Sequence, residues 1–144
     1  EPEYLKTTGD AVTNYSEWTI PLGRRFRALK LWFLIRSYGL VDLQMRIRNH
    51  VLWAEELCSK IRLLEGFQIT TDPILSLFSF RCPGDDMAQQ RLVDAINDDG
   101  RIYLTQGAFA DQKIIRVQVG QFDTTREDVM SVATVVSEVW EAIK

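Results

Sequence analysis

The spacing of apolar residues predicts two consecutive helices in the first half of the chain. Residues 24–38 carry apolar side chains on nearly every face of a helix, a pattern typical of a helix that is buried on more than one side. Gly39 is expected to end this helix and Gly66 the next one. Asp42 is predicted to cap the second helix, whose apolar residues recur every three or four positions. That stripe consists of Leu43, Ile47, Val51, Ala54, Cys58 and Ile61.

Short apolar runs alternate with helical patterns in the second half of the chain. Four strands are expected, at residues 67–70, 74–81, 102–105 and 113–119. Asp72-Pro73 is expected to break the chain between the first two strands, and residues 106–112 to connect the last two. Asp86 and a capping box at residues 124–127 are predicted to begin the two helices of this half. The order of elements predicts an α+β domain, whose antiparallel or mixed sheet has helices on one face.

Size and charge exclude several classes of protein. The 144 residues are enough for one domain with a core. With 17 Lys and Arg against 20 Asp and Glu, the net charge is −3, which argues against a nucleic-acid partner. The longest apolar run has five residues, 31–35, whereas a membrane span needs about 20. Cys58 and Cys82 are too few for a disulfide framework and are expected to be reduced thiols in a cytoplasmic protein.

Ordinary catalytic motifs are missing from the sequence. There is no phosphate-binding glycine loop, no CxxC pair and no metalloprotease motif, and His50 stands alone without metal-ligating neighbours. Basic residues interleave with Phe26, Trp32 and Phe33, which is compatible with a helix on a membrane surface or on nucleic acid. The net charge and the apolar pattern favour a buried interdomain helix instead. We therefore expect a further domain or subunit, and a chain that is part of a longer protein.

Two segments resemble a known enzyme family. They are Tyr4-Leu5-Lys6 and residues 18–33, which read WTIPLGRRFRALKLWF. Both resemble the group II pyridoxal-phosphate-dependent amino-acid decarboxylases, especially those that act on aromatic amino acids or on histidine. The similarity continues at Tyr38-Gly39, within residues 43–50, and at residues 78–81 and 114–116, and so extends over essentially the whole chain.

The resemblance implies a fold and a division into domains. The family has the aspartate-aminotransferase type of fold, with a large cofactor domain and a small C-terminal domain, and works as a homodimer. Residues 1–29 would be the end of the large domain and residues 30–144 the small domain. The family's pyridoxal 5'-phosphate is held by a lysine in a His-Lys motif that lies further upstream. No lysine here matches that motif, so the chain alone is expected to be inactive and not to bind the cofactor covalently.

The resemblance also implies roles for three residues. A mobile loop of the family carries a tyrosine in a Tyr-Leu-Lys context, which Tyr4 matches. After carbon dioxide has left, the α-carbon must receive a proton, and a positioned phenol can act as that general acid. Gly23 matches a position that lines the substrate's ring pocket, with Leu22 beside it. The absence of a side chain at Gly23 leaves room for a large ring.

The predicted activity of the parent protein is the decarboxylation of an aromatic L-amino acid to an amine. Two alternatives remain. One is a stand-alone α+β interaction module, whose Trp32 and Phe33 surface binds a partner. The other is decarboxylation coupled to oxidative deamination on the same fold. Relatives with that chemistry have replaced the loop tyrosine, so Tyr4 favours simple decarboxylation. No nucleic acid or membrane is expected among the partners, which would be the large domain, a second subunit and the amino acid.

Overall fold

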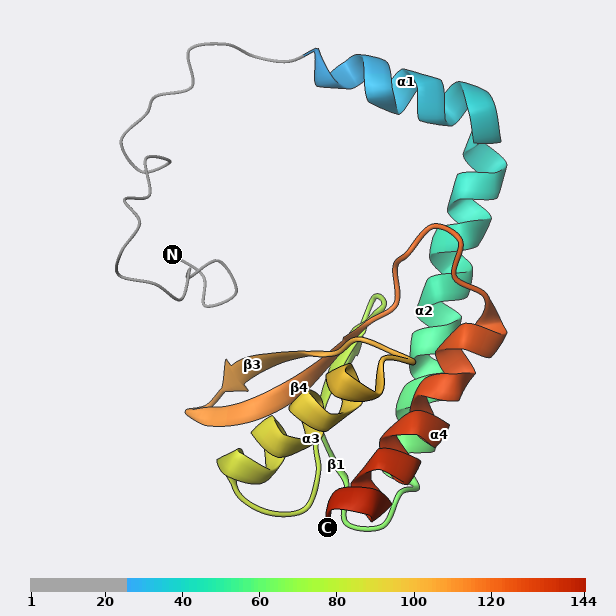
Figure 1. Ribbon diagram of the computed structural model, residues 1–144. Coiled ribbons are helices and arrows are strands. Elements are labelled where there is room, and N and C mark those ends of the chain that lie inside the picture. The colour runs from blue at the N-terminus through green and yellow to red at the C-terminus, as the bar shows by residue number, and fades with distance from the viewer. Residues whose placement is uncertain (1–25) are drawn as a thin grey trace, which may run out of the picture. The chain divides into compact units, whose positions relative to one another are not determined.

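The computed structural model describes residues 26–144 (Figure 1). They belong to two compact units, Glu1–Leu43 and Gln44–Lys144, and each unit is described by itself. The domain boundary expected between residues 29 and 30 stays a prediction.

The first unit contains the helix α1, Arg27–Tyr38. None of its side chains is buried. Even the large apolar side chains of Leu31, Trp32 and Phe33 are 54–59% exposed. Gly39 ends the helix, as predicted. It has a φ of 76° and donates its backbone N–H to the carbonyl of Ile35 at 2.8 Å. A positive φ ends the regular helix at this position, and glycine adopts such a φ without strain.

The helix α2 spans Leu40–Arg62. The prediction that Asp42 caps this helix is wrong, because α2 begins two residues earlier and Asp42 lies within its first turn. The apolar stripe is buried only in the second half of the helix, at Ala54, Leu57, Cys58 and Ile61. In the first half, Ile47 is 62% exposed. Burial therefore stops where the helix extends past the domain core.

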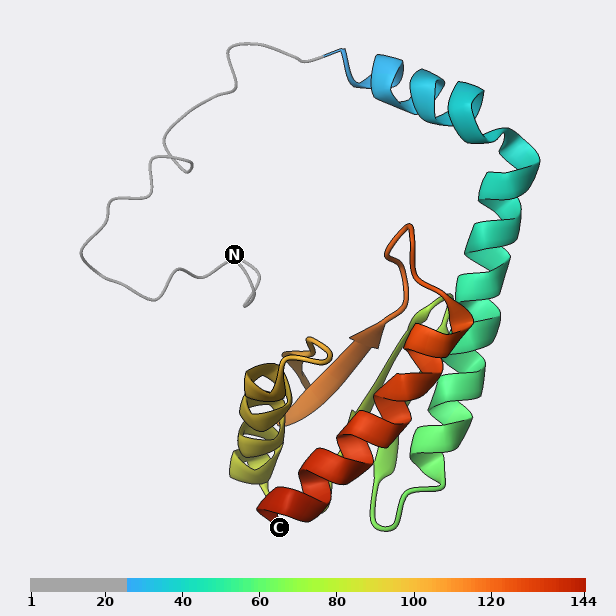
Figure 2. The same ribbon diagram turned by 45° about the vertical axis from the view of Figure 1, so that its right-hand side comes forward.

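Four antiparallel strands form one sheet in the order β1-β2-β4-β3. The strands are β1 Gln68–Ile74, β2 Leu77–Arg81, β3 Thr105–Phe109 and β4 Gln112–Gln118. The remaining helices are α3 Asp86–Asp99 and α4 Arg126–Ile143. Figure 2 shows α3, α4 and the second half of α2 on the same side of the sheet. The predicted architecture, α+β with helices on one face, is confirmed.

The core lies between this face of the sheet and the three helices. Phe78 and Phe80 of β2 are completely buried, and they pair with Val117 and Ile115 of β4. Because side chains alternate along a strand, these four residues point to the same face. Equally buried side chains come from the three helices: Leu57 and Ile61 of α2, Leu92 and Ile96 of α3, and Val136 of α4.

Three predicted strand boundaries are wrong. Asp72-Pro73 lies inside β1, which tolerates a proline because it is an edge strand with irregular pairing. The chain reverses instead after Leu75, whose φ is 55°. The third strand is not 102–105 but β3, which occupies most of the expected connection 106–112. Its hairpin turn is only Ala110-Asp111, with positive φ at both residues, the type I′ pattern that usually contains Asn-Gly.

The predicted helix starts are displaced by one residue. Asp85, not Asp86, caps α3, and its side chain accepts the backbone N–H of Ala88 at 2.9 Å. The capping box of α4 is formed by Thr125 and Asp128 rather than by residues 124 and 127. In each case two adjacent residues have the same side chain, Asp85 and Asp86 or Thr124 and Thr125. The sequence pattern therefore does not decide which of the two caps the helix.

Candidate functional site

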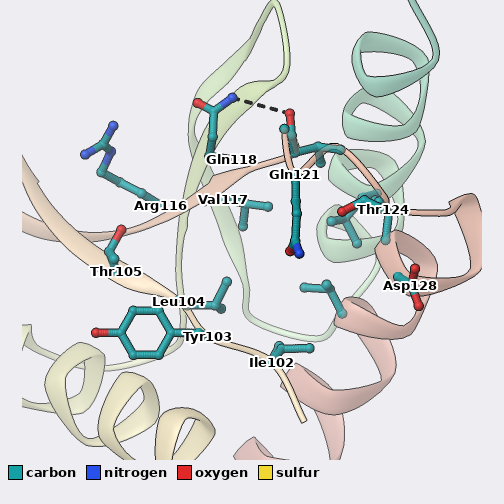
Figure 3. A pocket seen from close by; sticks show the side chains of 15 residues that line it. Ile102, Tyr103, Leu104, Thr105, Arg116, Val117, Gln118, Gln121, Thr124 and Asp128 are labelled. Atoms are coloured by element: carbon teal, nitrogen blue, oxygen red, sulfur yellow. Dashed lines mark hydrogen bonds between the residues drawn. The ribbon is translucent and has the colours of Figure 1, made fainter. Parts of the chain in front are cut away.

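The three site residues predicted from the resemblance, Tyr4, Leu22 and Gly23, lie outside the described residues. Their roles stay predictions. The structure does describe a cavity of about 340 Å³ within the second unit (Figure 3). It lies between the end of β4, the loop of residues 119–125, the start of α4 and the segment of residues 102–105.

The cavity combines an apolar floor with polar groups around it. The apolar part consists of Leu57, Ile102, Leu104, Val117, Val119, Val129 and Val132. The polar part consists of Tyr103, Thr105, Arg116, Gln118, Gln121, Thr124 and Asp128. An apolar surface with a few orienting polar groups is typical of small-molecule sites. Sequence analysis missed this site, because its residues are brought together from three separate segments.

Asp128 is the carboxylate of the cavity, and it accepts hydrogen bonds from the residue that caps α4. Its Oδ2 atom accepts the backbone N–H of Thr125 at 2.9 Å and the hydroxyl of the same residue at 2.7 Å. The hydrogen bond from the backbone N–H of Thr125 lowers the pKa of Asp128 most, and the hydrogen bond from the Thr125 hydroxyl lowers this pKa further. A carboxylate with a lowered pKa stays ionised near neutral pH and is a weak proton acceptor. Asp128 therefore anchors α4 and is a poor candidate for a general base.

Arg116 is the cation of the cavity. It lies on β4 opposite Thr105 of β3. A Cβ atom at Gly107 would come within 2.9 Å of Cδ of Arg116. The missing side chain at Gly107 therefore makes room for the arginine stem. This close approach is a packing reason for a glycine inside a strand.

Three contacts hold the loop of residues 119–125, which forms one wall of the cavity. The backbone N–H of Val119 donates to the carbonyl of Ser76 at 3.0 Å. Arg46 of α2 donates from Nη1 to the carbonyl of Phe122 at 3.1 Å, and its guanidinium carbon lies 4.4 Å from the centre of the Phe122 ring. Arg126, just after the loop, forms a two-pronged ion pair with Glu56 of α2. No sequence pattern could reveal the pairing of Arg46 with Phe122, because 76 positions separate them.

The remaining reactive side chains show no catalytic arrangement. Cys58 lies on the predicted apolar stripe of α2, and both Cys58 and Cys82 are free and buried. Burial raises the pKa of both thiols. His50 is half-buried beside Trp53, with ring centres 5.7 Å apart. In the described part of the chain, no group of three or more His, Cys, Asp or Glu side chains could hold a metal ion. Among residues 26–144, no helix has the length and apolar character needed to cross a membrane.

Neither described cavity fits pyridoxal phosphate. A site for this cofactor needs a lysine for the imine and a partner for the pyridine nitrogen, as well as groups that bind the phosphate. The cavity beside β4 has no lysine. A second cavity of about 370 Å³, between the end of α2 and α4, includes Lys60. It has no other cation and no aromatic side chain. Neither of these two cavities therefore has the side chains of a cofactor site.

Comparison with known proteins decides the family. A model of the pyridoxal-dependent decarboxylase conserved domain matches residues 1–83, which is more than half of the chain. The chain belongs to this family. The aromatic-L-amino-acid decarboxylase of Rattus norvegicus is 38% identical over 122 residues, covering 83% of this chain and 25% of that protein. The phenylacetaldehyde synthase of Arabidopsis thaliana is 33% identical over 147 residues, covering 95% of this chain and 30% of that protein.

A solved structure of the family confirms the fold. Tryptophan decarboxylase of Catharanthus roseus, determined in complex with L-tryptophan, is similar with a TM-score of 0.77 and 32% identity. The similarity covers 95% of this chain and 31% of that one. The expected small α+β domain of a pyridoxal-dependent decarboxylase is therefore confirmed. The chain spans about a quarter to a third of the length of the relatives that it matches.

Proposed function

We propose that the chain is the C-terminal part of a pyridoxal-phosphate-dependent decarboxylase, which converts aromatic L-amino acids to amines and carbon dioxide. The family match over residues 1–83 carries this proposal. The similarity to an aromatic-L-amino-acid decarboxylase and to a tryptophan decarboxylase supports the aromatic substrate. In the proposed parent enzyme, upstream residues hold the cofactor and two subunits form a cytoplasmic homodimer.

The exposed apolar side chains of α1 support a missing domain. Trp32 and Phe33 are 54% and 55% exposed, and their rings contact each other edge to face with centres 5.1 Å apart. Burying such side chains contributes about 1.5–3 kcal/mol each. We propose that α1 packs against the large domain of the same protein. The alternative, a stand-alone interaction module, has the same exposed helix but does not account for the family match.

We propose that Tyr4 supplies the proton that replaces the lost carboxylate. A phenol can hold a proton close to the α-carbon and transfer it once carbon dioxide has left. The closing of a loop around the substrate also excludes water. Gly23 and Leu22 would line the ring pocket, where the absence of a side chain at Gly23 leaves room for a large aromatic ring.

A second function is supported by the similarity to a phenylacetaldehyde synthase. That name describes an aldehyde product, which would fit decarboxylation coupled to oxidative deamination. The two candidates therefore differ in the product, which is an amine in one case and an aldehyde in the other.

The test uses the full-length parent protein with pyridoxal phosphate and four substrates, L-DOPA, L-tryptophan, L-phenylalanine and L-histidine. Amines, aldehydes and carbon dioxide are all measured. We expect an amine from at least one aromatic substrate. Tyr4→Phe should lower kcat for amine formation by about a hundredfold or more, since general acids contribute factors of about 10²–10⁴. Tyr15→Phe is the matched control in the same segment and should keep wild-type activity.

Each of the other outcomes has a defined meaning. Carbon dioxide with aldehyde as the main product would favour the second function. An unchanged rate of amine formation in Tyr4→Phe would refute the role of Tyr4 and leave the family activity intact. A full-length protein that forms neither product would refute the proposed activity.

A further inference from the structure

The end of α3 contains the one Asp-Gly pair of the sequence, Asp99-Gly100. In such a pair the backbone nitrogen of the glycine can attack the side-chain carboxyl of the aspartate, because no side chain shields that nitrogen. A bond forms between the nitrogen and Cγ, and one molecule of water leaves to give a cyclic succinimide. Water then breaks the bond between the nitrogen and the original backbone carbonyl carbon. The chain now continues through Cγ, and the residue has become isoaspartate.

The backbone around Gly100 is not arranged for this attack. Asp99 is the last residue of α3, and its backbone must leave the helical conformation before the nitrogen can approach Cγ. Gly100 has a φ of 79°, and its N–H donates to the carbonyl of Ile96 at 3.3 Å. The side-chain amide of Asn97 bonds the N–H and the carbonyl of Leu104, at 2.9 and 3.1 Å. Rotation at Gly100 therefore disturbs the whole connection between α3 and β3.

Arg101 holds both oxygens of the Asp99 carboxylate. Its Nε donates to Oδ2 at 2.6 Å, and its Nη2 donates to Oδ1 at 3.2 Å. These hydrogen bonds lower the pKa of Asp99 and so favour its ionised form. An ionised carboxylate is a poor target, since its oxygen can leave as water only after it has been protonated. Nη1 of Arg101 donates to Glu138 at 2.6 Å, which joins the end of α3 to α4.

We propose that Asp99-Gly100 is a site of isoaspartate formation that the folded chain keeps closed, and that Arg101 is the residue that closes it. An isoaspartate at position 99 adds one carbon to the backbone and turns the former backbone carboxyl into a side chain. The helix end and the pairing with Arg101 would both be lost. The inference is independent of the proposed decarboxylase activity, because neither Asp99 nor Arg101 lines a described cavity.

The test measures isoaspartate in the 144-residue chain during incubation at neutral pH and physiological temperature. Samples are digested with chymotrypsin, and residues 93–103 are analysed by electron-transfer mass spectrometry, which distinguishes isoaspartate from aspartate. A synthetic peptide of residues 93–103 gives the rate for the same sequence without the fold. We expect the rate in the folded chain to be lower by about tenfold or more, because attack requires the helix end to open.

Four variants separate the contact with Asp99 from a general loss of stability. Arg101→Gln should raise the rate by about threefold to tenfold, the effect of one hydrogen bond. Arg101→Lys should give an intermediate rate, since it keeps the charge and lacks the planar fork that bonds both oxygens. Glu138→Gln keeps the contact with Asp99 and should stay within about twofold of wild type. Arg126→Gln is the matched control, because it removes a different exposed ion pair, with Glu56. The urea midpoint of each variant is measured alongside its rate.

Several results would overturn the inference. A synthetic peptide that forms no isoaspartate would remove the site, and a folded chain that reacts as fast as the peptide would show that the fold does not close it. A wild-type rate in Arg101→Gln would refute the role of Arg101. An equally large increase in Arg126→Gln would show that the rate follows overall stability. The same increase in Glu138→Gln would assign the protection to the tie with α4 instead of the contact with Asp99.

Discussion

Replacing Gln89 by leucine is expected to destabilise the chain by about 2–5 kcal/mol. Gln89 of α3 is completely buried and makes two hydrogen bonds to the backbone of Cys82. Its Oε1 accepts the N–H of Cys82 at 2.8 Å, and its Nε2 donates to the carbonyl of the same residue at 3.0 Å. The side chain thus completes the hydrogen bonding of the chain as it leaves β2.

The magnitude follows from the two backbone groups that the substitution leaves without a partner. A buried donor or acceptor without a hydrogen bond costs about 1–3 kcal/mol. Two such groups give about 2–6 kcal/mol, and the greater apolar character of leucine offsets a little of this. The carbonyl of Asp85 also loses a bond from Nε2, but it keeps the N–H of Gln89 at 3.4 Å. The loss is a large fraction of the total stability of a typical domain, about 5–15 kcal/mol.

Urea unfolding followed by circular dichroism measures the effect, with free energies extrapolated to water. Gln90→Leu is the matched control on the same helix. Gln90 contacts Asp94 at 2.9 Å and Lys113 at 3.3 Å near the surface, so its loss should change stability by about 0.5 kcal/mol or less. A Gln89→Leu variant within 1 kcal/mol of wild type would refute the reasoning. It would show that the groups of Cys82 find other partners.

Three further predictions concern the core, a turn and a helix start. Phe78→Ala should cost about 3–5 kcal/mol in urea unfolding, because this ring is fully buried. Gly84→Ala should lower the urea midpoint, since φ is 110° and a new Cβ would lie 2.9 Å from Cβ of Ala88. The pKa of Asp128 is lowered in the folded state by Thr125. Its stabilising effect is therefore complete above the unfolded pKa of about 3.9 and is lost as pH falls through the lower folded value. Asp128→Asn should accordingly lower the melting temperature at pH 7 and have less effect below about pH 3.

Elements with strong periodicity were predictable from the sequence. The helix around Trp32 and the buried second half of α2 follow from apolar residues at helical spacing. The strand β4 follows from the alternation around Ile115 and Val117. Such patterns are local, because each residue's neighbours on a helix face or a strand face are a few positions away in the sequence.

Elements without such a pattern were missed. The strand β3 has the sequence TQGAF, with no alternation of apolar and polar residues. It is a strand because its backbone pairs with β4 across the turn at Ala110-Asp111. The cavity between β4 and α4 could not be predicted from the sequence either. Arg116, Gln121 and Asp128 come close to Leu104 only after the sheet and α4 have packed together.

The sequence by itself determined the family, the fold class and the helices, because literal motifs and apolar spacing are properties of neighbouring residues. Only the tertiary structure decided which strands pair, where half of the apolar stripe of α2 leaves the core, and which side chains surround the cavity. Those outcomes depend on contacts between residues far apart in the chain, such as Arg46 with Phe122 and Gln89 with Cys82. The energy of such a contact depends on burial and geometry, and both arise only when the whole domain has folded.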